Sequence, residues 1–340
     1  MGEGRAIEQA VNNKATLDLT EVFDLVRDDL VRVEEELGRH SDSAIEPVAR
    51  VARYLQSGGG KRLRPALHLL AAGLCGYQGP GAVRLGAVFE LIHTATLVHD
   101  DVIDTADTRR GRPSANRRWG NSLTVLAGDW LYMEAFRLAL AERNLRILDI
   151  LIELTQVMVE GELIQLTQLG NADISEAEAL DISRRKTACL FSACLRLGAV
   201  LGQKSKSEED RLAHFGLQVG MAFQIIDDLL DFTASPERLG KPVVNDLREG
   251  KVTLPLVYAL QDSSHSVREK VETVLKEKGF VSVASGEITD LVRNSGAVER
   301  TRERAQEFVA DATYCLEGFP NSTYKRALEA IPHFVLTRDY

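Results

Sequence analysis

The stretch SEEDRLAHFGLQVGMAFQIIDDLLDFTAS, residues 207–235, indicates what kind of fold this chain adopts. It begins with a serine and three acidic residues, a typical helix start, and apolar residues then recur at helical spacing up to an aspartate cluster. The stretch closes a longer segment without proline, which runs from Ser114 to Ser235. Proline disrupts helix interiors, and no alternating strand pattern interrupts the segment. We therefore predict stacked helices and an all-α fold.

Helical patterns continue on both sides of this segment. An early helix is expected from about Asp18 to Gly38, and Ser175–Glu178 matches a capping box inside the proline-free segment. Turns are expected at two glycine-rich places, Ser57–Gly60 and Gly111–Pro113. Since neither a linker nor a repeat stands out, we predict one domain over residues 1–340, with residues 1–17 as a flexible extension.

The composition favours an acidic cytoplasmic protein. The formal net charge of −9 argues against nucleic acid as a partner, because such partners require a basic face. The four cysteines have neither Cys-x-x-Cys nor zinc spacing, and they occur in apolar sequence where inert thiols are expected. We find neither a signal-peptide pattern nor an apolar run long enough to span a bilayer, so we expect no transmembrane segment.

Two acidic clusters lie inside apolar sequence and share the pattern Asp-Asp-x-x-Asp. They cover Asp100–Asp104 and Asp227–Asp231. Residues four apart project from the same helix face, so the outer aspartates of each cluster converge and need a compensating cation. Oxygen donors without His or Cys suit magnesium, which usually binds one or two carboxylates together with substrate phosphates. The alternative is solvated surface charge, which two copies in apolar surroundings disfavour.

Carboxylate metal sites imply an anionic ligand, and the chain carries basic residues that suit one. Lys61 and Arg64 adjoin a glycine turn, which is not a P-loop because Arg62 follows the lysine. Arginine side chains match diphosphate oxygens, and further basic residues occur later in the chain: Arg109, Arg110, Lys186 and Lys241. His93 lies about two helical turns before Asp100 and on nearly the same face, which favours a phosphate-facing role.

Together these motifs resemble the trans-isoprenyl diphosphate synthases, or polyprenyl synthetases. The resemblance runs from about Gly58 to Tyr340 and rests on Gly59–Pro65, Asp100–Asp104 with Arg109–Gly111, Lys186–Thr187, Phe223–Gln224 with Asp227–Asp231, Gly240–Pro242 and Asn245–Lys251. It implies an isoprenoid synthase-type helical bundle around a deep central cavity, usually assembled as a homodimer.

The resemblance also implies a role for each matching residue. Three Mg²⁺ ions, with Mn²⁺ as an alternative, would be held on an allylic diphosphate by Asp100, Asp104, Asp227 and Asp231. The same diphosphate would contact Arg109, Lys186, Thr187, Gln224 and Lys241. The isopentenyl diphosphate would contact Lys61, Arg64, His93 and Arg110. Catalysis would rest on Asp100, Asp101, Asp104, Lys186, Thr187, Gln224, Asp227 and Lys241.

The implied reaction joins isopentenyl diphosphate to the allylic diphosphate head to tail. Charge on the departing diphosphate is stabilised, the C1–O bond breaks to an allylic cation, and the isopentenyl double bond attacks that carbon. Apolar residues around the aspartates would exclude water, which would quench the cation.

Other functions fit only part of the pattern. A class I terpene cyclase normally has a different second metal motif, where this chain repeats Asp-Asp-x-x-Asp. A silent subunit of a heteromeric synthase tends to have degraded aspartate motifs, whereas both are intact here. The catalytic subunit of such a synthase stays an alternative. A metal-dependent hydrolase using His99 and Asp100 lacks a further histidine at metal spacing.

Product length depends on the residues below the first cluster. Bulk one turn before Asp100 would limit the growing chain, and this level is occupied by the small residues Ala95 and Thr96, with Ile92 a turn further. The segment His93–Leu97 and the C-terminal Leu336–Tyr340 look most like long-chain octaprenyl or solanesyl synthases, which would extend farnesyl or geranylgeranyl diphosphate. A shorter-chain synthase is the alternative.

Overall fold

The structure, a computed structural model, describes residues 17–40, 45–57, 59–109, 111–234, 244–261 and 263–338. The helices, in chain order, are α2 (Leu19–Asp24), α3 (Arg27–Arg39), α4 (Glu46–Gln56), α5 (Leu63–Leu74), α6 (Gly81–Ile103), α7 (Ala115–Trp119), α8 (Asn121–Leu140), α9 (Leu145–Gln168), α10 (Glu176–Ser183), α11 (Cys189–Leu201), α12 (Lys206–Thr233), α14 (Asn245–Arg248), α15 (Leu254–Gln261), α16 (His265–Glu277), α17 (Ser285–Asn294), α18 (Ala297–Cys315) and α19 (Thr323–Thr337). A π-helical turn, η1 (Arg184–Ala188), joins α10 to α11, and an antiparallel hairpin of β1 (Thr108–Arg109) and β2 (Arg112–Pro113) follows α6. The prediction of an all-α fold is confirmed.

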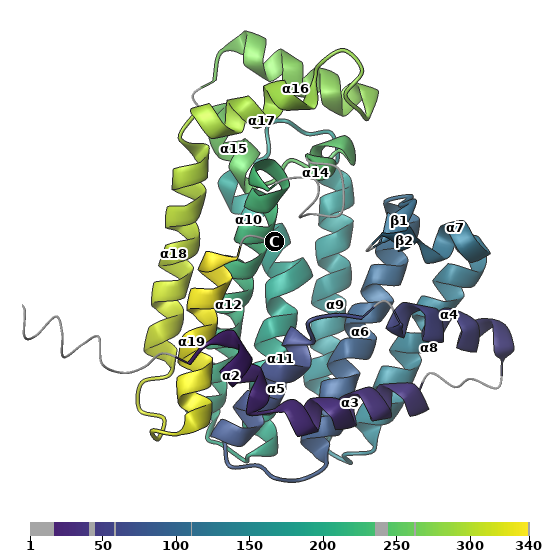
Figure 1. Cartoon of the computed structure of the whole chain (residues 1–340), viewed down its shortest axis with the longest axis vertical. Coiled ribbons are helices and arrows are strands. Elements are labelled where there is room, and N and C mark those ends of the chain that lie inside the picture. The colour runs from purple at the N-terminus through teal and green to yellow at the C-terminus, as the bar shows by residue number, and fades with distance from the viewer. Residues whose placement is uncertain are drawn as a thin grey trace, which may run out of the picture.

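The long helices α6, α8, α9, α11 and α12 run side by side through the middle of the molecule (Figure 1). Helix α11 packs against both α5 and α12, while α18 and α19 pack against the other side of α12. A single cluster of buried apolar side chains extends from Val22 near the start of the described chain to Val335 near its end. The last helix is therefore part of the same core as the first.

Two predicted helix starts can be compared with the structure. The Ser175 capping box is confirmed, because Ser175 and Glu178 exchange side-chain and backbone hydrogen bonds. The start expected at Ser207 is wrong by two residues. Helix α12 is capped by Ser205, whose Oγ accepts from the backbone of Glu208, while the Glu208 carboxylate accepts from the Ser205 N–H at 2.9 Å. Only Ser205 has a glutamate three residues later, as the capping box requires, whereas Ser207 has Asp210 at that position.

The expected helix from Asp18 to Gly38 is divided into α2 and α3. The apolar spacing holds, since Val22, Val33 and Leu37 are buried, but Val26 has a backbone ψ of 13° and interrupts the helical geometry. The break lets α2 lie against α19, so the first and last helices of the described residues are in contact.

Two glycines allow η1 and α11 to approach α12 closely. A Cβ atom at Gly216 would lie 2.6 Å from the carbonyl oxygen of Phe191, and one at Gly220 would lie 2.6 Å from the Cα atom of Ala188. Because backbone atoms are the neighbours, a side chain at either position would force the helices apart. This close packing brings η1 beside the aspartate-bearing half of α12.

Replacing Gly220 with alanine is therefore expected to lower the free energy of unfolding by about 1–3 kcal/mol, the usual cost of overpacking. Gly38 is the matched control, because it is an exposed glycine within α3 and a Cβ atom added there would have nothing within 4 Å. Alanine there should be neutral or stabilising by about 0.5–1 kcal/mol. Chemical denaturation of both variants measures the difference, and equal midpoints would contradict the close approach.

Helix α6 is, within the described ranges, the one helix long and apolar enough to cross a membrane by length and composition. Its most apolar window is 67% buried inside the bundle. A core helix of a large bundle meets the same criteria, and the packing of α6 against α8, α5 and α3 identifies it as one.

Candidate active site

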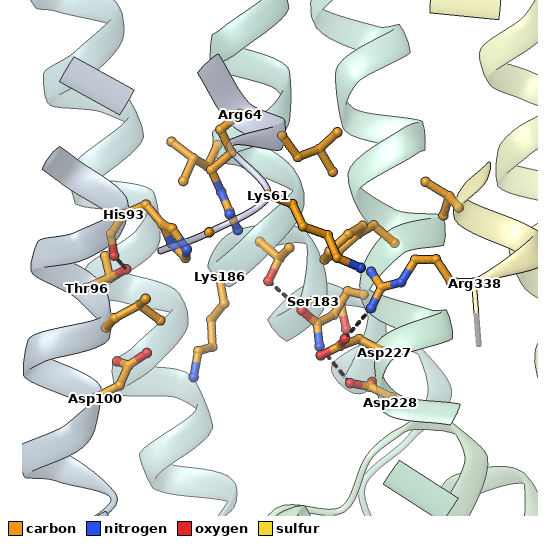
Figure 2. A pocket seen from close by; sticks show the side chains of 18 of the residues that line it. Lys61, Arg64, His93, Thr96, Asp100, Ser183, Lys186, Asp227, Asp228 and Arg338 are labelled. Atoms are coloured by element: carbon orange, nitrogen blue, oxygen red, sulfur yellow. Dashed lines mark hydrogen bonds and ion pairs between the residues drawn. The ribbon is translucent and has the colours of Figure 1, made fainter. Parts of the chain in front are cut away.

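A cavity of about 1240 Å³ opens between the central helices and reaches both of the predicted aspartate clusters. Its lining comes from most of the chain, and Figure 2 shows the acidic residues from α6 and α12 on opposite sides of it, with basic residues between and above them. Apolar side chains of α2 and α19, including Phe23, Ile331 and Phe334, form part of the wall. The site is thus a mixed charged and apolar chamber.

The first cluster turns two of its carboxylates toward basic residues at the cavity. Asp100 lines the cavity, and its pKa is raised to about 6, mainly by burial, with further increases from Glu162 and Asp104. Asp104 accepts a hydrogen bond at 2.8 Å from Lys251 Nζ, which also bonds Glu249 at 2.8 Å. Burial alone would lower the pKa of Lys251, but these two carboxylates raise it above its usual value.

Asp101 lies away from the large cavity. Its side chain is 1% exposed and its Oδ1 atom accepts from Arg109 Nε at 2.7 Å. Burial raises the pKa of Asp101, and the Arg109 guanidinium opposes that increase. Both residues line a separate small cavity of about 50 Å³ beside the β1–β2 hairpin. Of the adjacent aspartates, Asp100 faces the large cavity, while Asp101 anchors Arg109.

In the second cluster, Asp227 and Asp228 line the cavity, whereas Asp231 does not. Asp231 is 1% exposed, and its Oδ2 atom accepts the backbone N–H of Asp246 at 3.1 Å. The last aspartate therefore anchors the segment that begins at Val244, which carries Asp246 to the cavity wall.

A polar chain connects η1 to α12. Thr187 Oγ1 donates to Gln224 Oε1 at 2.6 Å, and Gln224 Nε2 donates to Asp228 Oδ1 at 2.7 Å. Burial, followed by the charge of Asp246, raises the pKa of Asp228 well above its usual value. The three side chains are thereby fixed in place at the cavity wall, as the predicted roles of Thr187 and Gln224 require.

Lys186 enters the cavity from the π-helical turn η1, a kind of helix irregularity that is frequent at functional sites. Its Nζ atom lies 2.5 Å from Glu162 Oε2 and also donates to Gln165. In the view of Figure 2 its ammonium lies between Asp100 and Asp227. No motif or spacing in the sequence distinguishes Glu162, which holds this lysine from α9.

The predicted phosphate-binding residues Lys61, Arg64 and His93 all line the same cavity, and in the view of Figure 2 they lie above Asp100, with His93 on the same helix, α6. Arg62, between the first two, also borders the cavity, but its guanidinium is engaged in ion pairs. It has a left-handed φ of 50° and binds Glu34 and Glu90, with 2.5 Å separating its Nη1 atom from Glu90 Oε1. These ion pairs hold a strained backbone residue, which places Lys61 and Arg64 on the cavity side.

Arg338, just after α19, completes the site from the end of the chain. Its Nη2 atom lies 2.7 Å from Asp227 Oδ1, 111 residues away in sequence, and its guanidinium stacks over Phe223 with 4.1 Å to the ring centroid. In the sequence, Lys251 and Arg338 stand out only as parts of family-like segments. Their direct contacts with the two aspartate clusters give each a place in the site.

Some of the predicted site residues do not line the large cavity or lie outside the residues that the structure describes. Arg110 and Lys241 lie outside the described residues. Of the three residues predicted to form the wall below the first cluster, Thr96 lines the cavity and donates its hydroxyl to the His93 carbonyl at 2.7 Å. Ala95 and Ile92 are fully buried in the core and are not among the cavity-lining residues. Helical phase accounts for the difference between the adjacent residues: Thr96 lies three residues after His93 and four before Asp100, which also line the cavity, whereas Ala95 is one residue out of that phase.

The donor set fits a divalent metal that binds together with a phosphate ligand. Among the residues that the structure describes, no three carboxylate, imidazole or thiol groups converge on one point as a complete metal site would require. Asp100 and Asp227 instead offer oxygen donors from opposite walls. Magnesium commonly takes one or two carboxylates and completes its shell with water and substrate phosphates, so this separation suits it.

Comparisons with known proteins agree with this arrangement. The polyprenyl synthetase family model matches residues 45–291. The octaprenyl diphosphate synthase of Escherichia coli is 36% identical, covering 95% of this chain and 100% of that protein. A short chain isoprenyl diphosphate synthase of Methanothermobacter thermautotrophicus is 34% identical over 95% of this chain and 100% of its own length.

A solved structure is also similar. The polyprenyl synthase of Caulobacter crescentus, determined with calcium and isoprenyl diphosphate, superimposes with a TM-score of 0.91 at 34% identity, covering 96% of this chain and 100% of that one. With the family match over most of the sequence and the same fold throughout, the chain belongs to the polyprenyl synthetase family, a family of prenyltransferases.

Proposed function

We propose that this enzyme condenses isopentenyl diphosphate with an allylic diphosphate, in the presence of Mg²⁺, to make a long-chain all-trans polyprenyl diphosphate. One observation carries the proposal. A single cavity holds two sets of groups, with the carboxylates of Asp100 and Asp227 on opposite helices and the side chains of Lys61, Arg64 and His93 above them. Two diphosphate substrates need such a division, one bound through metal and the other through cations alone.

The side chains suggest how the reaction proceeds. Mg²⁺, held by Asp100 and Asp227 with Asp104 beside the first, would neutralise charge on the departing diphosphate. Lys186 supplies a fixed positive charge between the two walls, where developing negative charge is stabilised best. The Thr187–Gln224 pair lies at the cavity wall and would line the reaction centre, and the apolar residues of α2 and α19 would keep water from the allylic cation.

We further propose farnesyl or geranylgeranyl diphosphate as the starter, three metal ions, and Mn²⁺ as a working substitute for Mg²⁺. The octaprenyl synthase relative and the small Thr96 on the cavity wall before Asp100 favour a long product. A shorter product is the second candidate, because a short chain synthase is nearly as similar. The metal found in the Caulobacter protein is calcium, which takes oxygen ligands as Mg²⁺ does.

The test is incubation of the purified chain with farnesyl diphosphate, labelled isopentenyl diphosphate and Mg²⁺, followed by dephosphorylation and chromatography of the products. We expect polyprenols longer than geranylgeraniol, with no product when the starter is omitted or when excess chelator is added. Products that stop at geranylgeraniol would favour the short-chain alternative. Full-rate synthesis in chelator would contradict the metal assignment.

We also propose that the enzyme is a homodimer formed through α8 and α9. Exposed apolar side chains recur every seven residues on both helices, with Leu126, Met133 and Leu140 on α8 and Leu145, Ile152, Val159 and Leu166 on α9. Two of these, Met133 at 62% and Leu145 at 75%, are among the most exposed apolar residues described. A second copy of the chain would cover such a stripe, and the resemblance to the family implies a homodimer.

Glutamate at Met133 and Val159 together is expected to convert the dimer to a monomer, because each charge would be desolvated at the interface. Analytical ultracentrifugation measures the assembly. Val31→Glu is the matched control, since Val31 is also an exposed apolar residue, 54% exposed, but lies on α3. A wild-type monomer, or a double variant that stays dimeric, would contradict the proposed interface, and a second chain in the native assembly would favour the heteromeric alternative.

The remaining proposals concern organisation and location. We propose that residues 1–340 form one domain and that the enzyme acts in the cytoplasm. In support, the buried core extends from Val22 to Val335, and all four cysteines are unpaired. Burial raises the pKa of the Cys75 thiol to about 12, as expected for an inert core side chain rather than a reactive one.

A further inference from the structure

The contact between Arg338 and Asp227 joins the last helix to the centre of the site. The guanidinium is held on one side by the Asp227 carboxylate, 2.7 Å away, and on its face by the ring of Phe223. The Arg338 side chain is only 18% exposed, whereas that of Asp227 is 51% exposed and faces the cavity. A positive group from α19 therefore lies on the carboxylate that the proposed function assigns to a metal ion.

The guanidinium is not fully satisfied in this position. Its Nε and Nη1 atoms are buried and, within the described residues, have no hydrogen-bond partner. An arginine with a purely structural role normally uses these donors, because a buried donor without an acceptor is costly. These donors are shielded while Arg338 is paired with Asp227. Because Arg338 lines the large cavity, a movement of its guanidinium into the cavity would present them to a ligand with several oxygen acceptors.

A second cation stands beside it. Lys61, which is distant from Arg338 in the sequence, lines the same cavity. Burial lowers the pKa of Lys61, and the charge of Arg338 lowers it further. Figure 2 shows the ammonium of Lys61 next to the guanidinium of Arg338, above Asp227. Two cations brought together in a cavity make a binding site for a multiply charged anion such as a diphosphate.

We propose that Arg338 exchanges partners during the catalytic cycle, pairing with Asp227 before the metal binds and with the diphosphate of the isopentenyl substrate afterwards. This inference rests on the proposed function. A divalent cation at Asp227 would displace the guanidinium, because both need the same carboxylate oxygens. The displaced guanidinium would then lie beside Lys61, where it completes a cationic pair for the second substrate. Metal loading would thus prepare the isopentenyl site.

The proposed exchange predicts that removal of Arg338 strengthens the binding of the metal and weakens the binding of isopentenyl diphosphate. Without Arg338, the metal no longer competes with an ion pair, so Mn²⁺ should bind about twofold to fivefold more tightly, the range a partly exposed pair is worth. Isopentenyl diphosphate should bind roughly tenfold more weakly, because a charge-assisted contact is lost. A residue that merely supports the fold would weaken both.

The experiment compares Arg338→Gln with the wild-type chain. Mn²⁺ binding is followed by electron paramagnetic resonance of the free ion, without substrates. Isopentenyl diphosphate binding is followed by calorimetry with Mn²⁺ present and no allylic starter, so no reaction occurs. Arg326→Gln is the matched control, because Arg326 is an exposed arginine on α19, the helix that Arg338 directly follows. Arg338→Lys should restore part of the substrate affinity, and melting curves exclude unfolding.

Tighter Mn²⁺ binding together with weaker isopentenyl diphosphate binding in Arg338→Gln, and neither in Arg326→Gln, supports the exchange. Unchanged binding of both ligands, or weaker binding of both by a folded variant, overturns it. Neither measurement requires turnover, so the result is separate from the proposed function. If Asp227→Asn left Mn²⁺ binding intact, the metal assignment itself would fail, whatever Arg338 does.

Discussion

Alanine in place of Asp227 is expected to lower turnover by about a hundredfold or more, and alanine in place of Asp100 should do the same. Each carboxylate projects into the cavity from its own wall, so neither can replace the other as a metal ligand. The loss should appear in kcat as well as kcat/KM, because the missing charge acts on the departing diphosphate. Steady-state kinetics with saturating Mg²⁺ measures both quantities.

Asp210→Ala is the matched control for the first of these substitutions. Asp210 also lies on α12, but it is exposed and pairs with Lys206 at the surface, so its removal should leave turnover nearly unchanged. The active-site variants should remain folded, because removing the buried Asp100 carboxylate also removes its desolvation cost, and the Asp227 side chain is 51% exposed. Near wild-type turnover in both Asp100→Ala and Asp227→Ala would show that the two clusters are ordinary surface charge and not metal ligands.

Phenylalanine in place of Thr96 is expected to shorten the product while leaving the first condensations intact. Thr96 lines the cavity one turn before Asp100, and one helical turn rises about 5.4 Å, comparable to one isoprene unit. A ring at this level would block the growing chain early, below an unaltered metal site. Since steric overlap in a packed wall is strongly unfavourable, the change in product length should be sharp.

Ala95→Phe separates this explanation from a general packing effect. Ala95 is fully buried and faces the core rather than the large cavity. A ring there should destabilise the bundle and lower the yield of all products equally. Chromatography of dephosphorylated products, together with melting curves, distinguishes the two outcomes. A stable, active Thr96→Phe enzyme with unchanged products would contradict the role of Thr96 as a wall that limits the growing chain. A stable Ala95→Phe enzyme with shorter products would place the growing chain on the opposite face of α6.

Local chemistry made part of the site predictable from sequence. The spacing Asp-Asp-x-x-Asp fixes which carboxylates share a helix face, because the helical period is a property of the backbone alone. The capping box at Ser175 is equally local, since its partners are three residues apart. The prediction of stacked helices needed only the absence of proline and the apolar spacing, and it held for the described ranges.

Which face of a helix meets the cavity is not a local property. Asp100 and Asp101 are adjacent in sequence, yet one lines the cavity and the other is buried against Arg109. The same holds for Asp231, whose carboxylate is used to anchor the backbone of Asp246. These orientations depend on where neighbouring helices and the β1–β2 hairpin pack, so spacing alone could not distinguish the carboxylates.

Contacts between distant parts of the chain were decided by the tertiary structure alone. Lys251 reaches Asp104 across 147 residues of sequence, and Arg338 reaches Asp227 across 111. No periodicity or motif encodes such a pair, because its two members are brought together only when α6, α12 and α19 pack into one bundle. The sequence by itself determined the helices and the chemistry of their acidic clusters. The packing of those helices determined which cationic side chains contact the acidic clusters.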